Sequence, residues 1–175
     1  YFGDGKKNID RLEAEALLAG ITVDTKRFSI KTGARPFEAA SWLRRNGADT
    51  ASVRQFFQTD MDFFKLKASI IADAEILPRG IAFSVCYGQH PNIQILTSQA
   101  ADELLNIQDI RASFVAGSSE TGQTVISARS LGEVNVQTVM EKMGGGGHLA
   151  TAGAQLDKPL EEAVDDLKER IRDIQ

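Results

Sequence analysis

Four consecutive glycines constrain this chain more than any other segment, and they lie in the stretch MEKMGGGGHLATAGAQL, residues 140–156. Glycine loses more backbone entropy on folding than any other residue, at a cost of roughly 0.5–1 kcal/mol each relative to alanine in regular structure. A run of glycines is therefore expected where the backbone must turn or must approach another group closely. His148 follows the run directly.

A glycine-rich turn lets backbone N–H groups converge on an anion, and a helix that begins after the turn adds the positive end of its dipole. Both features favour a phosphate or a nucleotide, with Gly144, Gly145, Gly146 and Gly147 as a cradle and His148 at its rim. The alternative is a flexible hinge between two helices. The run is not a Walker loop, which requires a lysine, and it is not a dinucleotide fingerprint, because it follows a predicted helix rather than a strand.

The composition is typical of a soluble globular protein, with 42% hydrophobic and 25% charged residues in a chain of 175. No apolar run approaches the ~20 residues of a membrane-spanning helix, and the start YFGDGKKNID lacks a signal-peptide core. We therefore expect these residues to be cytosolic. The single cysteine, Cys86, cannot form an internal disulfide, and its place in the apolar run IAFSVCY predicts a buried strand position.

The charge of the chain limits the ligands that it is expected to bind. Lysine and arginine number 20 against 24 aspartates and glutamates, which gives a net charge of −4. Tight binding of duplex DNA depends on many phosphate contacts from a basic surface, and the sequence has no basic stripe. A small anionic ligand held by a few well-placed groups remains open.

The first part of the chain is predicted to be helical. A helix is expected to stop near Gly20 and to be followed by a polar turn at Asp24 and Thr25, and Thr50 is the expected N-cap of a short helix. The predicted helices begin at residues 10, 36, 50 and 61, and the last of them is a connecting helix over residues 61–78.

The second part mixes strands with helices. The β-rich runs are GIAFSVCYG, IRASFVAGSSE and GQTVISARS, and SSETGQ is the loop of a hairpin between the last two. Helices are expected over NIQILTSQAADELLNI, over VNVQTVMEKM and, after a cap at Asp157, over the carboxyl terminus with its apolar stripe from Leu160 to Ile171. The predicted fold class is α/β, a helical part followed by a mixed-sheet α/β domain.

Two of these segments resemble motifs of one family. MGGGGHLATAGAQL, preceded by VISARS, resembles the GGGGH motif of the DHH-associated domain, which forms the carboxyl half of DHH-family phosphoesterases. ALLAGITVDTKRF is similar to the last motif of the DHH catalytic domain, in which an aspartate in the context GIxxDTxxF binds metal. The resemblance spans nearly the whole chain and is greatest to the membrane-bound GdpP-type cyclic di-AMP phosphodiesterases of Gram-positive bacteria.

The resemblance implies a domain order and a role for particular residues. Residues 1–60 would be the end of the DHH domain, residues 61–78 a connecting helix, and residues 79–175 the substrate-binding DHH-associated domain. Asp24 would be one ligand of a two-manganese (Mn²⁺) centre that activates water.

The substrate-binding residues that the resemblance implies lie in the second domain. Arg129 and Ser127, on one face of the third strand, would reach the phosphate or base of the ligand. Arg35 is left between two roles, pointing into a cleft between the domains or lying on the surface ahead of a helix. The residues implied in nucleotide binding are Ser127, Arg129, Gly144, Gly145, Gly146, Gly147 and His148.

The chain departs from the family pattern at its amino end. It contains no DHH triplet, and its only histidines are His90 and His148. The earlier metal-binding motifs, together with the family's membrane spans and sensor domains, are expected upstream of Tyr1. We therefore expect a carboxyl-terminal fragment, at the cytoplasmic face of the membrane in the parent protein, that binds nucleotide and hydrolyses little or none.

The predicted parent is a manganese-dependent phosphodiesterase that opens cyclic di-AMP to linear pApA. Two alternatives stay open: an oligoribonuclease or single-strand exonuclease of the same superfamily, and a non-catalytic nucleic-acid-binding module. The segment GITVDTKRF favours an enzyme, because a binding module has no need of a metal-binding aspartate. The resemblance also implies a homodimer, to which the apolar first helices would contribute.

Overall fold

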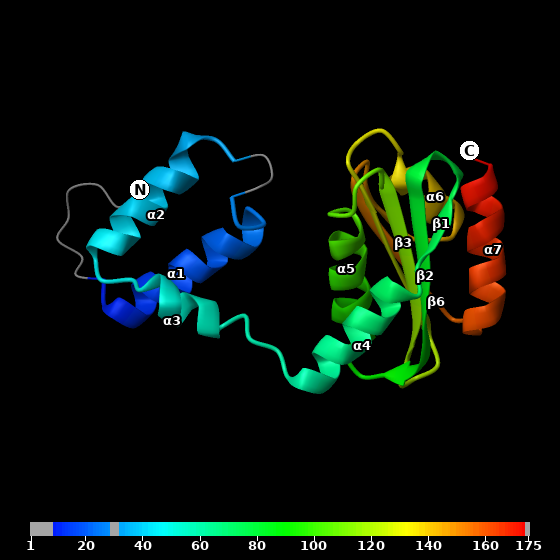
Figure 1. The fold of residues 1–175 in the computed structure, drawn as a ribbon, viewed down its shortest axis with the longest axis horizontal. Helices are drawn as coiled ribbons and strands as arrows, with labels where there is room; N and C mark the ends of the chain where they lie inside the picture. The colour runs from blue at the N-terminus through cyan, green and yellow to red at the C-terminus, as the bar shows by residue number, and fades with distance from the viewer. Residues whose placement is uncertain (1–8, 29–31, 174–175) are drawn as a thin grey trace. The chain divides into compact units, whose positions relative to one another are not determined.

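The computed structural model describes residues 9–28 and 32–173. The chain forms two compact units, Tyr1–Thr59 and Asp60–Gln175, which are drawn with their elements in Figure 1. Within the described ranges, no helix combines the length and the apolar character that crossing a lipid bilayer requires.

The first unit contains three helices, α1 (Arg11–Asp24), α2 (Ala34–Arg45) and α3 (Thr50–Gln55). Their small core is built from Ala14, Leu18, Leu43, Ala48 and Val53.

Two helix boundaries of this unit differ from the prediction. Helix α1 continues through Gly20 to Asp24, because Ile21, beyond the glycine, packs against the core and offsets the roughly 1 kcal/mol that glycine costs in a helix. The N-cap of α3 is Asp49 rather than Thr50, since its carboxylate accepts a hydrogen bond from the backbone N–H of Ser52.

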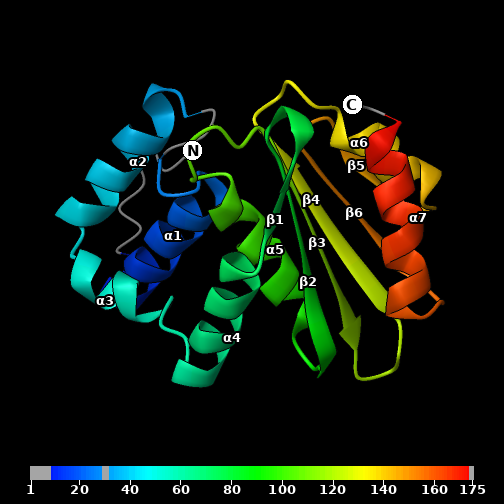
Figure 2. The same ribbon diagram turned by 45° about the vertical axis from the view of Figure 1, so that its right-hand side comes forward.

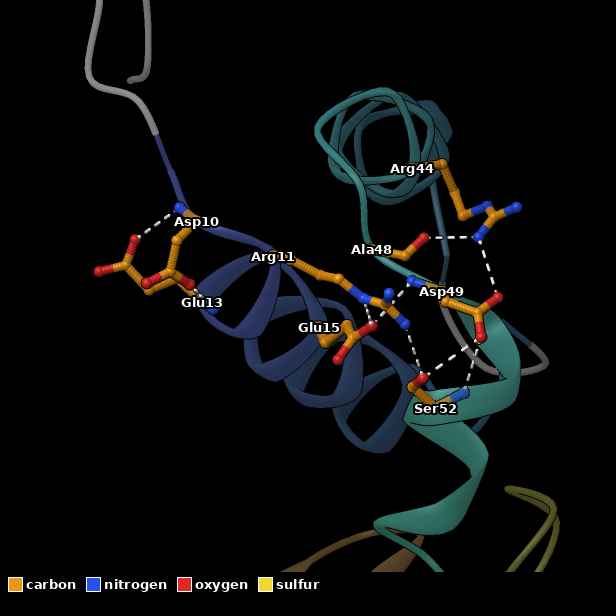
Figure 3. Close-up of polar contacts among 8 residues, drawn as sticks. All are labelled: Asp10, Arg11, Glu13, Glu15, Arg44, Ala48, Asp49 and Ser52. Atoms are coloured by element: carbon orange, nitrogen blue, oxygen red, sulfur yellow. Dashed lines mark hydrogen bonds and ion pairs between the residues drawn. The ribbon is translucent and has the colours of Figure 1, made fainter.

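A buried carboxylate joins α1 to the start of α3 (Figure 3). Arg11 Nε donates to Glu15 Oε1 at 2.8 Å, and the backbone N–H of Asp49 donates to the same oxygen at 3.2 Å. Glu15 is only 6% exposed, and the hydrogen bond from Arg11 holds the pKa of its carboxyl below the ordinary value. Arg11 Nη2 also donates to Ser52 Oγ at 3.2 Å, so α1 and α3 are connected through both residues of the ion pair.

The second unit is built on a six-stranded mixed sheet in the order β1-β2-β3-β4-β6-β5. Only β2 and β3 run parallel, and the other neighbouring pairs are antiparallel. The α/β class with a mixed sheet is therefore confirmed. The strands are β1 (Glu75–Leu77), β2 (Ile81–His90), β3 (Ala112–Ser119), β4 (Thr124–Ser130), β5 (Gly146–His148) and β6 (Thr151–Leu156).

Helices cover both faces of this sheet (Figures 1 and 2). Helices α4 (Met61–Ala72) and α5 (Ile93–Leu104) pack on one face, around a core that includes Ile70, Leu96 and Val115. Helices α6 (Val136–Lys142) and α7 (Leu160–Arg172) pack on the other face, around a core that includes Phe114 and Met140. Helix α5 lies over β3 and β4.

The three long strands and the hairpin before β4 agree with the sequence pattern, and Cys86 is buried in β2 as expected. Burial raises the pKa of the Cys86 thiol to about 11, so the thiol stays protonated at neutral pH. The helix predicted over residues 61–78 ends at Ala72, because β1 takes residues 75–77 to pair with the edge of β2. Asp157 does not cap α7, which begins after Pro159 without a side-chain cap.

The segment after the glycines is also different from the prediction. No helix begins there, and β5 and β6 form a hairpin at the edge of the sheet instead. Gly144 and Gly145 thus connect α6 to an edge strand that contains Gly146 and Gly147, and the predicted contribution of a following helix dipole is wrong.

Replacing Glu15 with glutamine should make the acid unfolding of the first unit less dependent on pH. The pKa of this carboxyl is lower in the folded unit than its ordinary value of 4.5. Its contribution to stability is therefore complete above the ordinary pKa and is lost as pH falls through the folded pKa. Trp42, the single tryptophan, lies in α2, so urea unfolding followed by its fluorescence from about pH 6 to about pH 3 measures this unit.

The matched control is Glu38→Gln, which changes an exposed glutamate of α2. We expect the wild type and the control to lose stability more steeply with acid than Glu15→Gln. If the free energy of unfolding depends on pH equally in all three proteins, Glu15 contributes nothing to the loss of stability in acid.

Candidate functional site

The register of the last three strands brings Arg129 and His148 into one row. Arg129 of β4 pairs with Thr151 of β6, and Thr151 pairs with His148 of β5. Residues paired directly across antiparallel strands point to the same face of the sheet. Arg129 contacts α5, so this row lies on the face that α5 covers.

A second row follows one strand repeat away on the same face. Ser127 of β4 pairs with Gly153 of β6, which pairs with Gly146 of β5. The Ser127 hydroxyl lies 3.0 Å from the hydroxyl oxygen of Thr97 in α5, which confirms the face. Two of the three positions in this row have no side chain, so the sheet is bare between Ser127 and the edge of β5.

The part of this face that lies beside α5, on β4, β6 and β5, is called the shelf. A hollow of about 410 Å³ lies where the shelf meets α5, and Ser127, Arg129 and Gly145 are among the residues that line it together with Gln94 and Ser98 of α5. Gly146 and His148 lie on the same face, beside the hollow. The shelf consists of Ser127, Arg129, Gly146, His148, Thr151, Gly153 and Gln155.

At three of the four positions in the run, the fold itself requires glycine. Gly144 has φ +82° and ends α6, where its N–H donates to Glu141 O at 3.0 Å and the N–H of Gly145 donates to Met140 O at 2.8 Å. This pair of bonds is a Schellman cap. The N–H groups of Gly144 and Gly145 are therefore used within the fold rather than held free for an anion.

The next glycines allow two backbones to approach closely. A Cβ added to Gly145 would lie 2.2 Å from the carbonyl oxygen of Gly153, and one added to Gly147, where φ is +144°, would lie 2.5 Å from the carbonyl oxygen of Thr151. A Cβ added to Gly146 would meet no atom of any residue beyond its two chain neighbours within 4 Å. Gly146 is thus the one residue of the run that leaves open space on the shelf.

Arg129 is held in place by α5. Its Nε donates to Asp102 Oδ1 at 3.0 Å, its Nη1 donates to Ala128 O at 2.9 Å, and its Nη2 donates to Ser98 Oγ. The side chain is 11% exposed. Because a guanidinium carries five N–H donors, two remain for another partner. Ser127 is 7% exposed, and its hydroxyl already bonds to Thr97, so it serves mainly as part of the wall.

The structure brings Ser127, Arg129, Gly145, Gly146 and His148 to the shelf or its hollow. It does not bring Gly144, which caps α6, or Gly147, which lies on the other face of β5, and within the described residues it assembles no metal centre.

Asp24 is exposed at the end of α1, and no group of three or more His, Cys, Asp or Glu side chains within residues 9–28 and 32–173 could hold an ion. Asp24 alone supplies one carboxylate, which does not fit a two-manganese site. Arg35 is exposed in the first turn of α2.

A larger hollow of about 810 Å³ lies within the helical unit and is lined by Arg27, Arg44 and Arg54 among others. None of the predicted metal or substrate residues lines it. Arg44 is already engaged, since its guanidinium donates to Ala48 O and lies 3.6 Å from Asp49 Oδ1. The shelf is therefore the better candidate, because most of the residues that the family resemblance implies in nucleotide binding lie on it or line its hollow.

Sequence reasoning missed the residues of α5 that orient Arg129. Ser98 and Asp102 are four residues apart and therefore lie on one side of the helix. The sequence does place these two polar residues beside the buried Ala101, on a helix whose other buried positions are mostly apolar. This pattern could have indicated that they have a buried polar partner. Their partner could not be read from the sequence, because it depends on which strand the helix covers.

Comparison with known proteins adds a family and several relatives. The DHHA1 domain family matches residues 82–175 of the chain. The chain is 46% identical over 166 residues to the cyclic-di-AMP phosphodiesterase GdpP of Geobacillus thermodenitrificans, a match that covers 94% of the chain and 25% of that protein. It is 43% identical over 158 residues to the cyclic-di-AMP phosphodiesterase PdeA of Listeria monocytogenes, covering 90% of the chain and 24% of that protein.

The chain thus spans about a quarter of the length of the curated relatives it matches. Among solved structures, an exopolyphosphatase-related protein from Bacteroides fragilis superposes with a TM-score of 0.79 at 18% identity, over 94% of the chain and 51% of that protein. This likeness concerns the fold.

The different surroundings of the glycines predict different effects of alanine. Gly145→Ala should destabilise the second unit by roughly 2 kcal/mol or more, because the new methyl group would overlap the backbone of β6 and force the strands apart. Gly146→Ala should change stability by no more than about 0.5 kcal/mol. Urea unfolding followed by far-ultraviolet circular dichroism measures both, and equal losses would contradict the close approach at Gly145.

Proposed function

The chain belongs to the DHHA1 domain family, and we propose that its shelf binds one nucleotide unit of cyclic di-AMP for a phosphodiesterase that opens this dinucleotide to linear pApA. The names of the relatives support the substrate, since two of them are cyclic-di-AMP phosphodiesterases. The observation that carries the proposal is the pair of rows across β4, β6 and β5. These rows place an arginine and a histidine at opposite ends of one row, beside the bare backbone of Gly146 and Gly153.

Arg129 is the proposed phosphate ligand. Two of its N–H donors remain after its bonds to Asp102, Ser98 and Ala128, and a charge-assisted bond to a phosphate oxygen is about twice as strong as a neutral one. Because α5 fixes the guanidinium before the ligand arrives, little side-chain entropy is lost on binding.

His148 and the glycines complete the proposed binding surface. His148 is exposed at the edge of β5, where its ring can donate to a phosphate oxygen or stack on a base. The absence of side chains at Gly146 and Gly153 lets a ribose or a flat base lie against the strands. A bulky residue at either position would occupy the volume of the ligand.

Hydrolysis is proposed for the longer phosphodiesterase rather than for these residues alone. Mn²⁺ is its proposed cofactor, and it would activate the attacking water. Asp24 would contribute one carboxylate, and the remaining ligands would come from outside the described residues. The 175-residue chain is accordingly proposed to bind the nucleotide without cleaving it.

A small dinucleotide is preferred over a long strand as the ligand. Proteins that bind single strands without sequence preference use a positively charged groove along the backbone, and this chain has a net charge of −4. The same charge disfavours duplex DNA. The homodimer and the attachment of the parent protein to the membrane stay predictions.

Calorimetric titration of the 175-residue chain with cyclic di-AMP, pApA and cyclic di-GMP tests the proposal. We expect an adenine dinucleotide to bind, and Gly146→Val to weaken binding at least about tenfold, because the isopropyl group fills the open space of the shelf. Circular dichroism should match the wild type, since no protein atom beyond residue 146 and its two chain neighbours lies within 4 Å of the position where the new Cβ would be placed.

The matched control is Gly20→Val, the same substitution at another open position, in α1 of the other unit. It should leave affinity unchanged. Failure of all three dinucleotides to bind the folded chain, or equal affinity in the wild type and Gly146→Val, would overturn the shelf as the binding site.

A further inference from the structure

Gln155 marks a third row on the shelf. It pairs with Val125 of β4, whose side chain belongs to the core beneath α5, so the Gln155 side chain emerges on the same face as Ser127 and Arg129. It also lines the hollow beside α5. Gln155 is exposed, and because Arg129 is the proposed phosphate ligand, the side-chain amide of Gln155 is available for another part of the nucleotide.

The orientation of this amide is set by a relay of hydrogen bonds. Gln123 Nε2 donates to Asp157 Oδ1 at 2.5 Å, and Gln155 Nε2 donates to Gln123 Oε1 at 2.5 Å. An ionised carboxylate only accepts hydrogen bonds, so Asp157 requires the NH₂ group of Gln123 to face it. The Gln123 oxygen then faces Gln155, and Gln155 must present its own NH₂ group to it. Gln155 is left with its oxygen and one N–H for another partner.

We propose, on the basis of the nucleotide site proposed above, that Gln155 selects adenine over guanine on the shelf. Its free oxygen accepts from the exocyclic amino group of adenine, and its remaining N–H donates to the neighbouring ring nitrogen, a pairing that glutamine makes with adenine N6 and N7. Guanine carries an oxygen where adenine carries the amino group. If guanine bound in the same position, its oxygen would face the side-chain oxygen of Gln155. Both atoms are hydrogen-bond acceptors, so no bond would form.

The fixed amide is what makes this selection effective. A glutamine that rotates freely can exchange its oxygen and nitrogen and so accommodate either base. Gln94, on the α5 wall of the same hollow, is such a residue, since within the described residues its side-chain amide has no hydrogen-bond partner. Gln123 and Asp157 are therefore positioning residues, which act on the base through Gln155.

The spacing of the rows agrees with a nucleotide held at both ends. Gln155 lies four residues beyond Thr151 along β6, which corresponds to about 13 Å between the row of Arg129 and the row of Gln155. Gly153 lies between them, without a side chain. A nucleotide with its phosphate at Arg129 would lay its sugar over Gly153 and bring the edge of its base to Gln155.

The test is the ratio of affinities of the 175-residue chain for cyclic di-AMP and cyclic di-GMP, measured by calorimetry at neutral pH. Gln155→Met keeps the length of the side chain and removes both hydrogen-bonding groups. It should lower the preference for adenine about tenfold, mainly by weakening cyclic di-AMP binding. Asp157→Asn lets the relay reverse, so it should lower the same preference by strengthening cyclic di-GMP binding.

Gln137→Met is the matched control, because Gln137 is a half-buried glutamine of α6 whose amide donates to Glu141 in an exposed hydrogen bond. It should leave both affinities unchanged. If the wild type binds adenine dinucleotide and Gln155→Met keeps the wild-type ratio, the selection by Gln155 is wrong while the nucleotide site stands. If neither dinucleotide binds the folded wild type, the nucleotide site itself is wrong and the selection falls with it.

Discussion

The close approach of Gly145 to the carbonyl oxygen of Gly153 is the constraint on which the shelf depends. A Cβ at residue 145 would lie 2.2 Å from that oxygen, so only glycine lets the chain pass from the end of α6 directly alongside β6. Gly144 makes the turn possible by closing α6 with a Schellman cap. Without these two residues β5 would not reach the sheet edge, and His148 would not share a row with Arg129. The entropy that the glycines cost is thus offset by a strand pairing that other residues would prevent.

The sequence predicts those elements whose pattern is local. The long strands of the second unit follow from β-rich runs bounded by turn residues, because β3 and β4 are buried on both faces and show no alternation. The stripe from Leu160 to Ile171 follows from burial at a period of 3.6 residues. The sequence does not predict the hairpin of β5 and β6, because β5 contains Gly146 and Gly147, glycine has a low strand propensity, and the strand forms only by pairing with residues 151–153. The passage of α1 through Gly20 was missed for the same kind of reason, since Ile21 gains its packing from other helices.

The residues of the candidate site likewise fall into those that local sequence patterns predict and those that depend on distant contacts. The motifs identify Ser127, Arg129 and His148, and the period of a strand is by itself enough to place the first two on one face. That His148 joins them depends on the register of β6 between β4 and β5, which no local pattern encodes. Asp102 and Asp157 were not predicted as site residues, because each acts on a side chain from a distant part of the chain: Asp102 on Arg129 and Asp157 on Gln123.

These two carboxylates explain how an acidic chain can suit the proposed anionic ligand. Asp102 accepts a hydrogen bond from Arg129 on the shelf, and Asp157 accepts one from Gln123, which in turn bonds to Gln155. These bonds fix the direction of the remaining hydrogen-bonding groups of Arg129 and Gln155. Asp102 leaves Arg129 with two directed N–H groups, and Asp157 leaves Gln155 with an ordered oxygen and N–H. Preorganised donors lose less entropy when a ligand binds than mobile surface cations do. Orientation can therefore supply the affinity and the selectivity that a large positive charge would otherwise have to provide.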